Sequence, residues 1–274
     1  MKITPIATGF FKLDGGAMFG TVPKSIWNKL NPADENNLCQ WAMRCLLIQY
    51  GDRNILIDTG IGRKQSEKFF SFYQLSGEDS LLSSLDAAGL QPCDITDLVL
   101  THLHFDHVGG AVSRGESGEL QPTFANAAVH VTEAQWKHAH NSNPREKASF
   151  LEENYQALAD RLVMVQEGQE FLPGLEACVF DGHTLGMLCP MIHTAEGPLL
   201  YAADLYPSVA HIPANYVMGY DIQPLITMQE RSRMNERAVS EGIRFFFEHD
   251  ARCISAALTQ DERGRFVACD SVLP

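Results

Sequence analysis

Short runs of apolar residues, many of them β-branched or aromatic, recur along the 274-residue chain, and polar or glycine-containing turns separate them. Runs of this length and composition are typical of buried strands. They predict strands at residues 45–49, 54–58, 97–101, 128–132, 175–180, 191–194, 199–203, 243–248 and 265–269.

Two segments have a helical pattern instead: residues 80–89, which contain three leucines and end at a glycine, and residues 228–241, which are rich in charge. Strands and helices mixed in one chain predict a layered α/β fold. No internal repeat or Gly/Ser-rich linker divides the sequence, so we expect one domain over residues 1–274. Residues 205–224 hold three prolines among aromatic residues and follow neither period, which favours an ordered loop that covers a site.

Charge and composition narrow the classes of partner. The chain carries 21 Lys and Arg against 34 Asp and Glu, a net charge of -13, and its cations form no dense cluster. This disfavours a nucleic-acid partner and leaves a small-molecule substrate as the expected one, with a homodimer left open. The seven cysteines are scattered without a Cys-x-x-Cys pair, as in a reducing compartment. No secretory signal or membrane-spanning run is visible, so the expected location is cytoplasmic, away from the membrane.

The segment with the most specific chemistry follows the apolar run at residues 97–101. Four ligand-type side chains occur there within six positions: His102, His104, Asp106 and His107. In extended backbone, residues two apart point the same way, so His102 and His104 can reach one ion. Asp106 and His107 lie beyond the strand end, where the chain turns and can approach a second ion. Imidazole and carboxylate are the ligands that zinc and related ions select.

Three later residues occupy similar positions. His183, Asp204 and His249 each follow an apolar run, and open α/β folds place their sites at the carboxyl ends of such strands. We therefore expect them to supply further ligands. Isolated histidines are more often surface or hydrogen-bonded residues, which is the interpretation we give to His130, His138, His140, His193 and His211.

The ordered pattern resembles the metallo-β-lactamase superfamily, whose His-x-His-x-Asp-His signature matches residues 102–107. Asp58, in an Asp-Thr-Gly turn, is similar to the family's turn upstream, so the resemblance covers residues 45 to 250 approximately. It implies a four-layer αββα sandwich, two mixed β-sheets flanked by helices. It also implies seven metal ligands in two groups that share a bridging Asp204: His102, His104 and His183 for one ion, and Asp106, His107 and His249 for the other. Asp58 would orient a ligand imidazole or serve as a turn or helix-cap aspartate.

Within the superfamily, the chain is most similar to the branch of N-acyl homoserine lactone lactonases and methyl parathion hydrolase-like enzymes, through residues 18–20 and 203–206. Lactonases of this branch have a tyrosine shortly after the bridging aspartate that stabilises the oxyanion. Tyr206 is the nearest equivalent, and packing on the core is its alternative role. Met187 departs from the family by replacing the last histidine of a Gly-His-Thr-x-Gly-His run, a position that is usually not a metal ligand.

The expected activity is that of a dinuclear metal-dependent hydrolase. Two divalent ions about 3.5 to 4 Å apart lower the pKa of a bridging water, and the resulting hydroxide would cleave a lactone or ester bond, with Asp106 as the hydrogen-bond acceptor of the nucleophile. Zinc fits the ligands best, although iron and manganese also accept a His/Asp set. The alternatives are a phosphotriester or phosphodiester hydrolase of the same fold and a non-catalytic metal-binding module.

Overall fold

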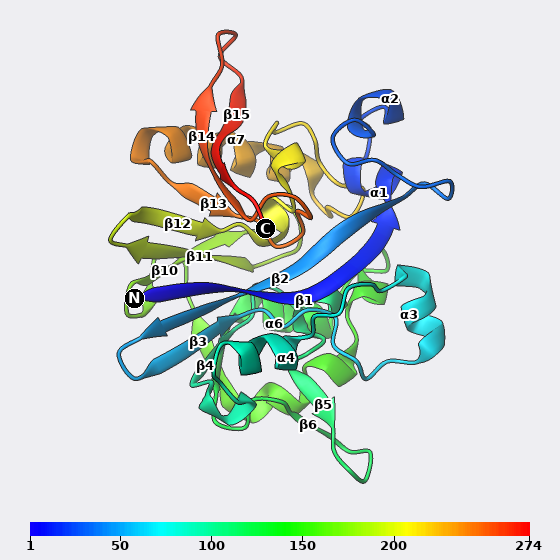
Figure 1. Cartoon of the computed structure of the whole chain (residues 1–274), viewed down its shortest axis with the longest axis vertical. Coiled ribbons are helices and arrows are strands. Elements are labelled where there is room, and N and C mark those ends of the chain that lie inside the picture. The colour runs from blue at the N-terminus through cyan, green and yellow to red at the C-terminus, as the bar shows by residue number, and fades with distance from the viewer. The chain divides into compact units, whose positions relative to one another are not determined.

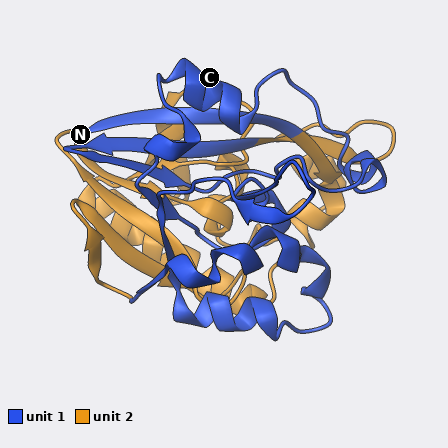
Figure 2. Ribbon diagram, turned by 90° about the horizontal axis from the view of Figure 1, so that it is seen from below, with its two compact units in different colours: residues 1–10, 43–166 blue, residues 11–42, 167–274 orange.

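The computed structural model describes all 274 residues, which divide into two compact units (Figure 2). Unit 1 contains residues 1–10 and 43–166, and unit 2 contains residues 11–42 and 167–274. The first two strands, β1 (Lys2–Asp14) and β2 (Leu38–Tyr50), each have residues in both units, so neither unit is one continuous piece of chain. A single domain over the whole chain stays a prediction.

Unit 1 is built on a six-stranded mixed sheet with the order β1-β2-β3-β4-β7-β8. Figure 1 labels the first four of these strands. Its last four strands are parallel to one another, and β2 pairs with β3 in the antiparallel sense. The carboxyl ends of the parallel strands therefore meet at one edge of the sheet. The remaining strands are β3 (Arg53–Ile57), β4 (Asp97–Val99), β7 (Ala128–Thr132), β8 (Leu162–Val165) and the separate hairpin of β5 (Val112–Arg114) and β6 (Leu120–Pro122).

The helices of unit 1 are short. The residues 80–89 predicted from sequence contain α4, which begins after Ser80 because the side chains of Ser80 and Ser83 form a capping box with each other's backbone N–H. The helices and 3₁₀ turns are α3 (Glu67–Tyr73), α4 (Leu81–Ala87), α5 (Phe105–Val108), α6 (Glu133–His140), Pro92–Asp94, Lys147–Ser149, Glu152–Asn154 and Gln156–Arg161.

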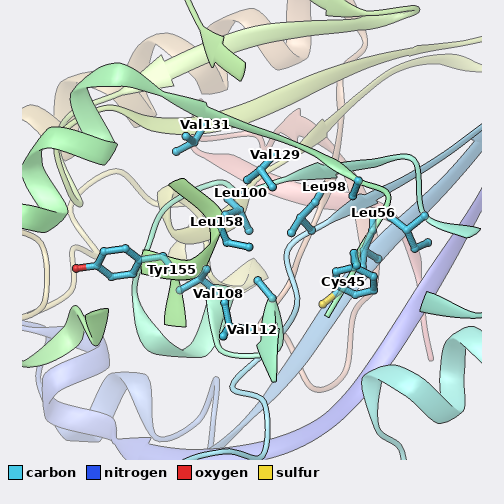
Figure 3. Close-up of a cluster of buried hydrophobic side chains, with 14 of the residues drawn as sticks. Cys45, Leu56, Leu98, Leu100, Val108, Val112, Val129, Val131, Tyr155 and Leu158 are labelled. Atoms are coloured by element: carbon cyan, nitrogen blue, oxygen red, sulfur yellow. The ribbon is translucent and has the colours of Figure 1, made fainter. Parts of the chain in front are cut away.

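The core of unit 1 fixes the strand that leads into the His-rich motif. Leu56, Leu98 and Val129 occupy equivalent register positions on three neighbouring strands, so their side chains share one face of the sheet. Figure 3 shows them in one cluster with Val108 and Val112, which follow the motif, and all five are buried. Burial of apolar side chains on both flanks of residues 102–107 holds this segment in place.

Unit 2 is built on a seven-stranded sheet with the order β15-β14-β13-β12-β11-β10-β9. Every neighbouring pair is antiparallel except β12 and β13, which are parallel, with Tyr201 opposite Phe246. Consequently β10, β12 and β13 all run in the same direction. The strands are β9 (Glu170–Leu172), β10 (Leu175–Phe180), β11 (Met187–Thr194), β12 (Gly197–Tyr201), β13 (Arg244–Phe246), β14 (Ser255–Gln260) and β15 (Phe266–Val272).

The helices of unit 2 are α1 (Gly15–Phe19), α2 (Lys24–Trp27) and the 18-residue α7 (Pro224–Glu241), with 3₁₀ turns at Ala203–Leu205 and Val209–His211. Helix α7 begins four residues before the predicted 228, because Pro224 occupies the first turn, where its missing N–H costs no hydrogen bond. Residues 206–223 connect the first 3₁₀ turn to α7 without a strand, as expected from their irregular pattern. None of the helices combines the length and the apolar composition that a membrane crossing requires.

Candidate metal centre

Unit 1 gathers the four residues of the His-x-His-x-Asp-His motif, which we call the motif set: His102, His104, Asp106 and His107. Strand β4 ends at Val99, and α5 carries Asp106 and His107. The ring centroid of His102 lies 4.5 Å from that of His104 and 3.9 Å from that of His107. The Asp106 Oδ2 is 3.9 Å from the His107 Nε2. All four side chains are buried, so the motif forms one compact group of ligand-type atoms.

Asp58 orients the motif set from the neighbouring strand. It follows β3, and because β3 and β4 are parallel it reaches the same sheet edge. Its Oδ2 accepts hydrogen bonds from the Thr101 hydroxyl at 2.6 Å and the His107 Nδ1 at 3.1 Å, and its Oδ1 accepts one from the Thr101 N–H at 2.9 Å. Asp58 is fully buried and has a φ of +58°. Of the two roles expected from sequence, the structure supports orientation of an imidazole.

Glu146 plays a comparable part for His104 and was missed by the sequence reasoning. Its Oε1 lies 2.9 Å from the His104 Nε2, and its Oε2 lies 2.6 Å from the His138 Nε2. Glu146 is buried, although the irregular segment that carries it has no periodic pattern and lies 42 positions after His104. No local signal marks such a contact, so only the folded chain reveals it. His138 belongs to this hydrogen-bond network.

Unit 2 gathers the other three predicted ligands, which we call the strand-end set: His183, Asp204 and His249. Each lies three residues beyond the end of its strand, after Phe180, Tyr201 and Phe246 respectively. Because β10, β12 and β13 run in the same direction, these three ends lie on one edge of the sheet. Equal offsets from strands of equal direction explain why residues far apart in sequence converge.

The two carboxylate oxygens of Asp204 face different histidines. The Asp204 Oδ2 lies 3.2 Å from the His183 Nε2, and the Oδ1 lies 3.2 Å from the His249 Nε2. The outer nitrogens of both imidazoles are also held, His183 Nδ1 at 2.9 Å from Asp221 and His249 Nδ1 at 2.8 Å from the carbonyl of Ala42. Asp221 lies in the irregular segment before α7 and was not singled out from the sequence. The strand-end set is thus a carboxylate between two fixed imidazoles.

Both sets fit a divalent transition metal. Their donors are imidazole nitrogens and carboxylate oxygens, the set that zinc, iron and manganese accept. Four imidazoles are held through one nitrogen by a carboxylate or a backbone carbonyl, the arrangement that fixes the tautomer of a metal-binding histidine and strengthens it as a ligand. A hydrogen-bonding role alone would not require this many oriented imidazoles in two buried groups.

Tyr206 lies in unit 2 with its hydroxyl directed at α7. The hydroxyl donates to the Arg231 carbonyl and lies 2.9 Å from both that oxygen and the Asn235 Oδ1. The side chain is fully buried, and burial raises the pKa of the hydroxyl above its usual range. Its ring packs on Phe245 at 4.7 Å. These contacts are those of a core residue, and a catalytic role of Tyr206 stays a prediction.

Aromatic side chains border the motif set within unit 1. Phe105 contacts Phe69 and Tyr73 of α3 at centroid distances of 5.4 and 4.8 Å, and Phe150 lies 4.8 Å from the His104 ring. Burial and, to a smaller extent, the charge of Asp106 raise the pKa of Tyr73 to about 12, so this phenol is protonated at neutral pH. We call Phe69, Tyr73, Phe105 and Phe150 the aromatic wall.

The isolated histidines are hydrogen-bonded, as expected. His130 pairs with Asp97 at 2.9 Å, His193 is exposed beside Glu176, and His140 contacts the Trp136 carbonyl. His211 is fully buried in unit 2, with Nε2 at 2.9 Å from the Met18 carbonyl and Nδ1 at 2.8 Å from the Ser208 hydroxyl. It joins the N-terminal part of unit 2 to the segment after Asp204.

The buried His211 should make stability depend on pH. Burial, with a smaller contribution from the Arg231 charge, lowers its pKa from 6.5 to about 3. In the unfolded chain it protonates near pH 6.5, so the unfolded state binds the extra proton and stability falls as the pH drops below that value. We expect this residue alone to reduce the free energy of unfolding by about 2 kcal/mol between pH 6.5 and pH 5.

Urea unfolding of wild type and of His211→Gln at these two pH values measures the effect. The variant should show a smaller pH difference, whereas His193→Gln, which removes an exposed histidine, should keep the wild-type difference. An unchanged pH dependence in His211→Gln would contradict the prediction.

The chain is similar in sequence and in fold to known metal-dependent hydrolases. The sequence profile of the Metallo-beta-lactamase superfamily matches residues 44–239. An N-acyl homoserine lactonase from Bacillus sp is 26% identical over 243 residues, which cover 82% of this chain and 87% of the relative. An N-acyl homoserine lactonase of Agrobacterium fabrum, AiiB, is 25% identical over 80% of this chain and 83% of its own length.

Two solved structures share the fold. A probable metal-dependent hydrolase from Staphylococcus aureus superimposes with a TM-score of 0.89 at 28% identity, covering 99% of this chain and 98% of that chain. AidC, described as a dizinc quorum-quenching lactonase, superimposes with a TM-score of 0.81 at 20% identity, covering 99% and 95%. The predicted fold of mixed sheets with flanking helices is confirmed, as is the expectation of a metal-dependent hydrolase at the level of the family. This chain belongs to the metallo-β-lactamase superfamily.

Proposed function

We propose that the motif set and the strand-end set act together to hold two divalent metal ions, with zinc as the best fit, in an enzyme that opens a lactone ring. The observation that carries the proposal is the position of Asp204, each of whose oxygens faces a different histidine at 3.2 Å. A carboxylate placed in this way suits a bridge between two ions. The ligands would be His102, His104 and His183 for one ion and Asp106, His107 and His249 for the other, with Asp204 shared.

Bound metal would supply a water of lowered pKa and a Lewis acid for the substrate carbonyl. The chain's own residues would do the rest. Asp106, buried beside His107, would accept a hydrogen bond from the attacking water and hold its proton on a carboxylate oxygen. Asp58, Glu146 and Asp221 would keep the imidazoles oriented, so that the ligands need not reorganise during the reaction.

The aromatic wall supports a substrate with an apolar chain. Phe69, Tyr73 and Phe105 form a contiguous ring cluster that includes the neighbour of Asp106 in sequence. Aromatic side chains offer a large apolar contact area to a ligand chain. An N-acyl homoserine lactone combines such a chain with a cleavable ring ester, and the relatives named as lactonases favour this class.

Metal analysis and a substrate panel test the proposal on the same preparation. We expect two equivalents of metal per chain by emission spectroscopy. We also expect a kcat/KM on N-decanoyl homoserine lactone of at least about 10⁴ M⁻¹ s⁻¹, in the range of ordinary enzymes, and a much lower value on an aryl phosphotriester. Faster turnover of the phosphotriester would favour the phosphotriesterase alternative. Two bound metals without turnover of either substrate would favour the non-catalytic module.

Two phenylalanines of helix α3 provide a matched pair of variants that tests whether the substrate has an apolar chain. Phe69 contacts Phe105, whereas Phe72 on the same helix is 64% exposed. Phe69→Ala should raise KM for the decanoyl lactone by about tenfold, the effect of removing an aromatic contact worth about 1.4 kcal/mol. Phe72→Ala should leave KM unchanged. Equal effects of the two substitutions would count against the aromatic wall as the acyl site.

A further inference from the structure

Unit 1 contains a cavity of about 370 Å³ that none of the predicted metal ligands lines. Its walls come from the loop after β3, the start of α4, and the β5 segment after the motif. Three of the lining residues are cationic, Arg63, Lys64 and Arg114, and none is acidic. The chain has a net charge of -13, so a cavity whose charged lining residues are all cationic locally reverses the overall charge.

Nearby carboxylates only partly neutralise this positive charge. Glu153 forms an ion pair with Arg114 at 3.0 Å. Arg63 is exposed at the cavity. Lys64 donates to the Gly109 carbonyl, an acceptor that carries no net charge. Three cations against one paired carboxylate produce a field that attracts anions.

Lys64 is the residue that an anion would stabilise most. Its side chain is largely withdrawn from solvent, and burial lowers its pKa to about 8, with Glu153 opposing this effect and Arg114 adding to it. A partly buried ammonium beside another cation costs free energy unless an anion neutralises it. The position of Lys64 therefore favours a negatively charged occupant of the cavity.

Hydroxyl groups add uncharged donors at the same place. Ser113 and Thr123 both line the cavity, and the Thr123 Oγ1 is buried without a hydrogen-bond partner. Cationic and hydroxyl donors that come from separate segments approach from several directions. This suits a tetrahedral group with at least three acceptor oxygens better than a planar carboxylate.

We propose that this cavity is a binding site for the phosphate group of a small molecule, with Lys64, Arg63 and Arg114 as its charged contacts. Its volume falls in the range of small-molecule pockets and exceeds what one phosphate group fills, so an organic portion can accompany the phosphate. The site is separate from the motif set and does not depend on the hydrolytic function proposed above.

Isothermal titration of the metal-loaded protein with inorganic phosphate, and separately with glycerol 3-phosphate, tests the proposal. Saturable binding is expected. Lys64→Met should weaken it by at least about tenfold and Arg63→Gln by about threefold, as loss of charge-assisted contacts predicts. Arg63→Gln alters an exposed side chain, so it remains informative if Lys64→Met does not fold. Tighter binding of the ester would identify a phosphorylated molecule as the ligand, and equal affinity would identify phosphate itself.

Lys68→Gln is the matched control. Lys68 is an exposed cation on α3 that does not line the cavity, and its substitution changes the net charge by the same amount. It should leave the affinity within about twofold of wild type, since exposed charges interact weakly through solvent. The absence of saturable binding would overturn the proposal. So would binding that Arg63→Gln and Lys64→Met leave intact, because the phosphate would then lie elsewhere, for example on the metal ions.

Discussion

Asp204→Asn should reduce kcat/KM by at least about 10³-fold, equivalent to about 4 kcal/mol of transition-state stabilisation, and the purified variant should retain fewer than two metal equivalents. Asparagine has the shape of aspartate, so packing around it is preserved. Its amide nitrogen cannot bind a cation, however, and it would replace one of the two oxygens that face His183 and His249. The bridge would be lost while the strands that carry it stay folded. Steady-state kinetics and emission spectroscopy measure the two effects.

The same chemical change far from the site provides the control. Asp261 lies in the turn between β14 and β15, where it pairs with Arg265 at the surface. Asp261→Asn should retain wild-type activity and metal content. An Asp204→Asn protein that kept both metals and most of its activity would contradict the proposed bridge.

Local pattern was enough to locate most of the strands that carry the candidate site. The runs at 128–132 and 175–180 match β7 and β10 at both ends, and the run at 243–248 contains β13. These segments are buried and apolar, so hydrophobic burial and backbone hydrogen bonding favour the same structure. Ligand-type residues follow the carboxyl ends of these and similar runs, which is why the sequence pointed to His183, Asp204 and His249 as candidate ligands.

Other strands carry weaker local signals. Strand β1 contains Pro5 and Gly9 within its 13 residues, two residues that disfavour strands in sequence-based reasoning. Strand β14 has small residues and two exposed polar positions at its end, and its pairing with β15 stabilises it. Such strands are defined by the partner they pair with, and a pattern along one segment does not contain that partner.

The residues that orient the candidate ligands were also hard to predict from the sequence. Glu146 and Asp221 lie in irregular segments, 42 positions from His104 and 38 positions from His183 respectively. In the sequence, a carboxylate in a loop that orients a histidine cannot be told from a solvent-exposed carboxylate, because the histidine it contacts is far away along the chain. Asp58 was the exception, since it is the last residue of a predicted strand and opens a turn that resembles the family's. Orienting residues are therefore predictable only where they follow a regular element.

Asp58→Asn should weaken metal retention by about 10- to 100-fold, the usual effect of removing a residue that orients a metal ligand. The substitution should not strain the backbone, because asparagine tolerates the positive φ of this position better than most residues. What changes is the hydrogen bonding. The amide NH₂ would replace the oxygen that accepts from both the Thr101 hydroxyl and the His107 Nδ1. Because the NH₂ group is itself a donor, these two groups would lose their acceptor. Competition with a chelator measures the change in metal retention.

Asp97→Asn separates orientation of a metal ligand from a general loss of stability. Asp97 is also a buried aspartate of unit 1 with an imidazole partner, His130, and it lies at the start of β4, whereas the motif set follows the end of that strand. Its substitution removes an ion pair with Arg53 and should lower the unfolding midpoint without changing metal affinity. If both variants lost metal equally, Asp58 would be a structural residue only. If Asp58→Asn alone lost metal, its contact with His107 would be the cause.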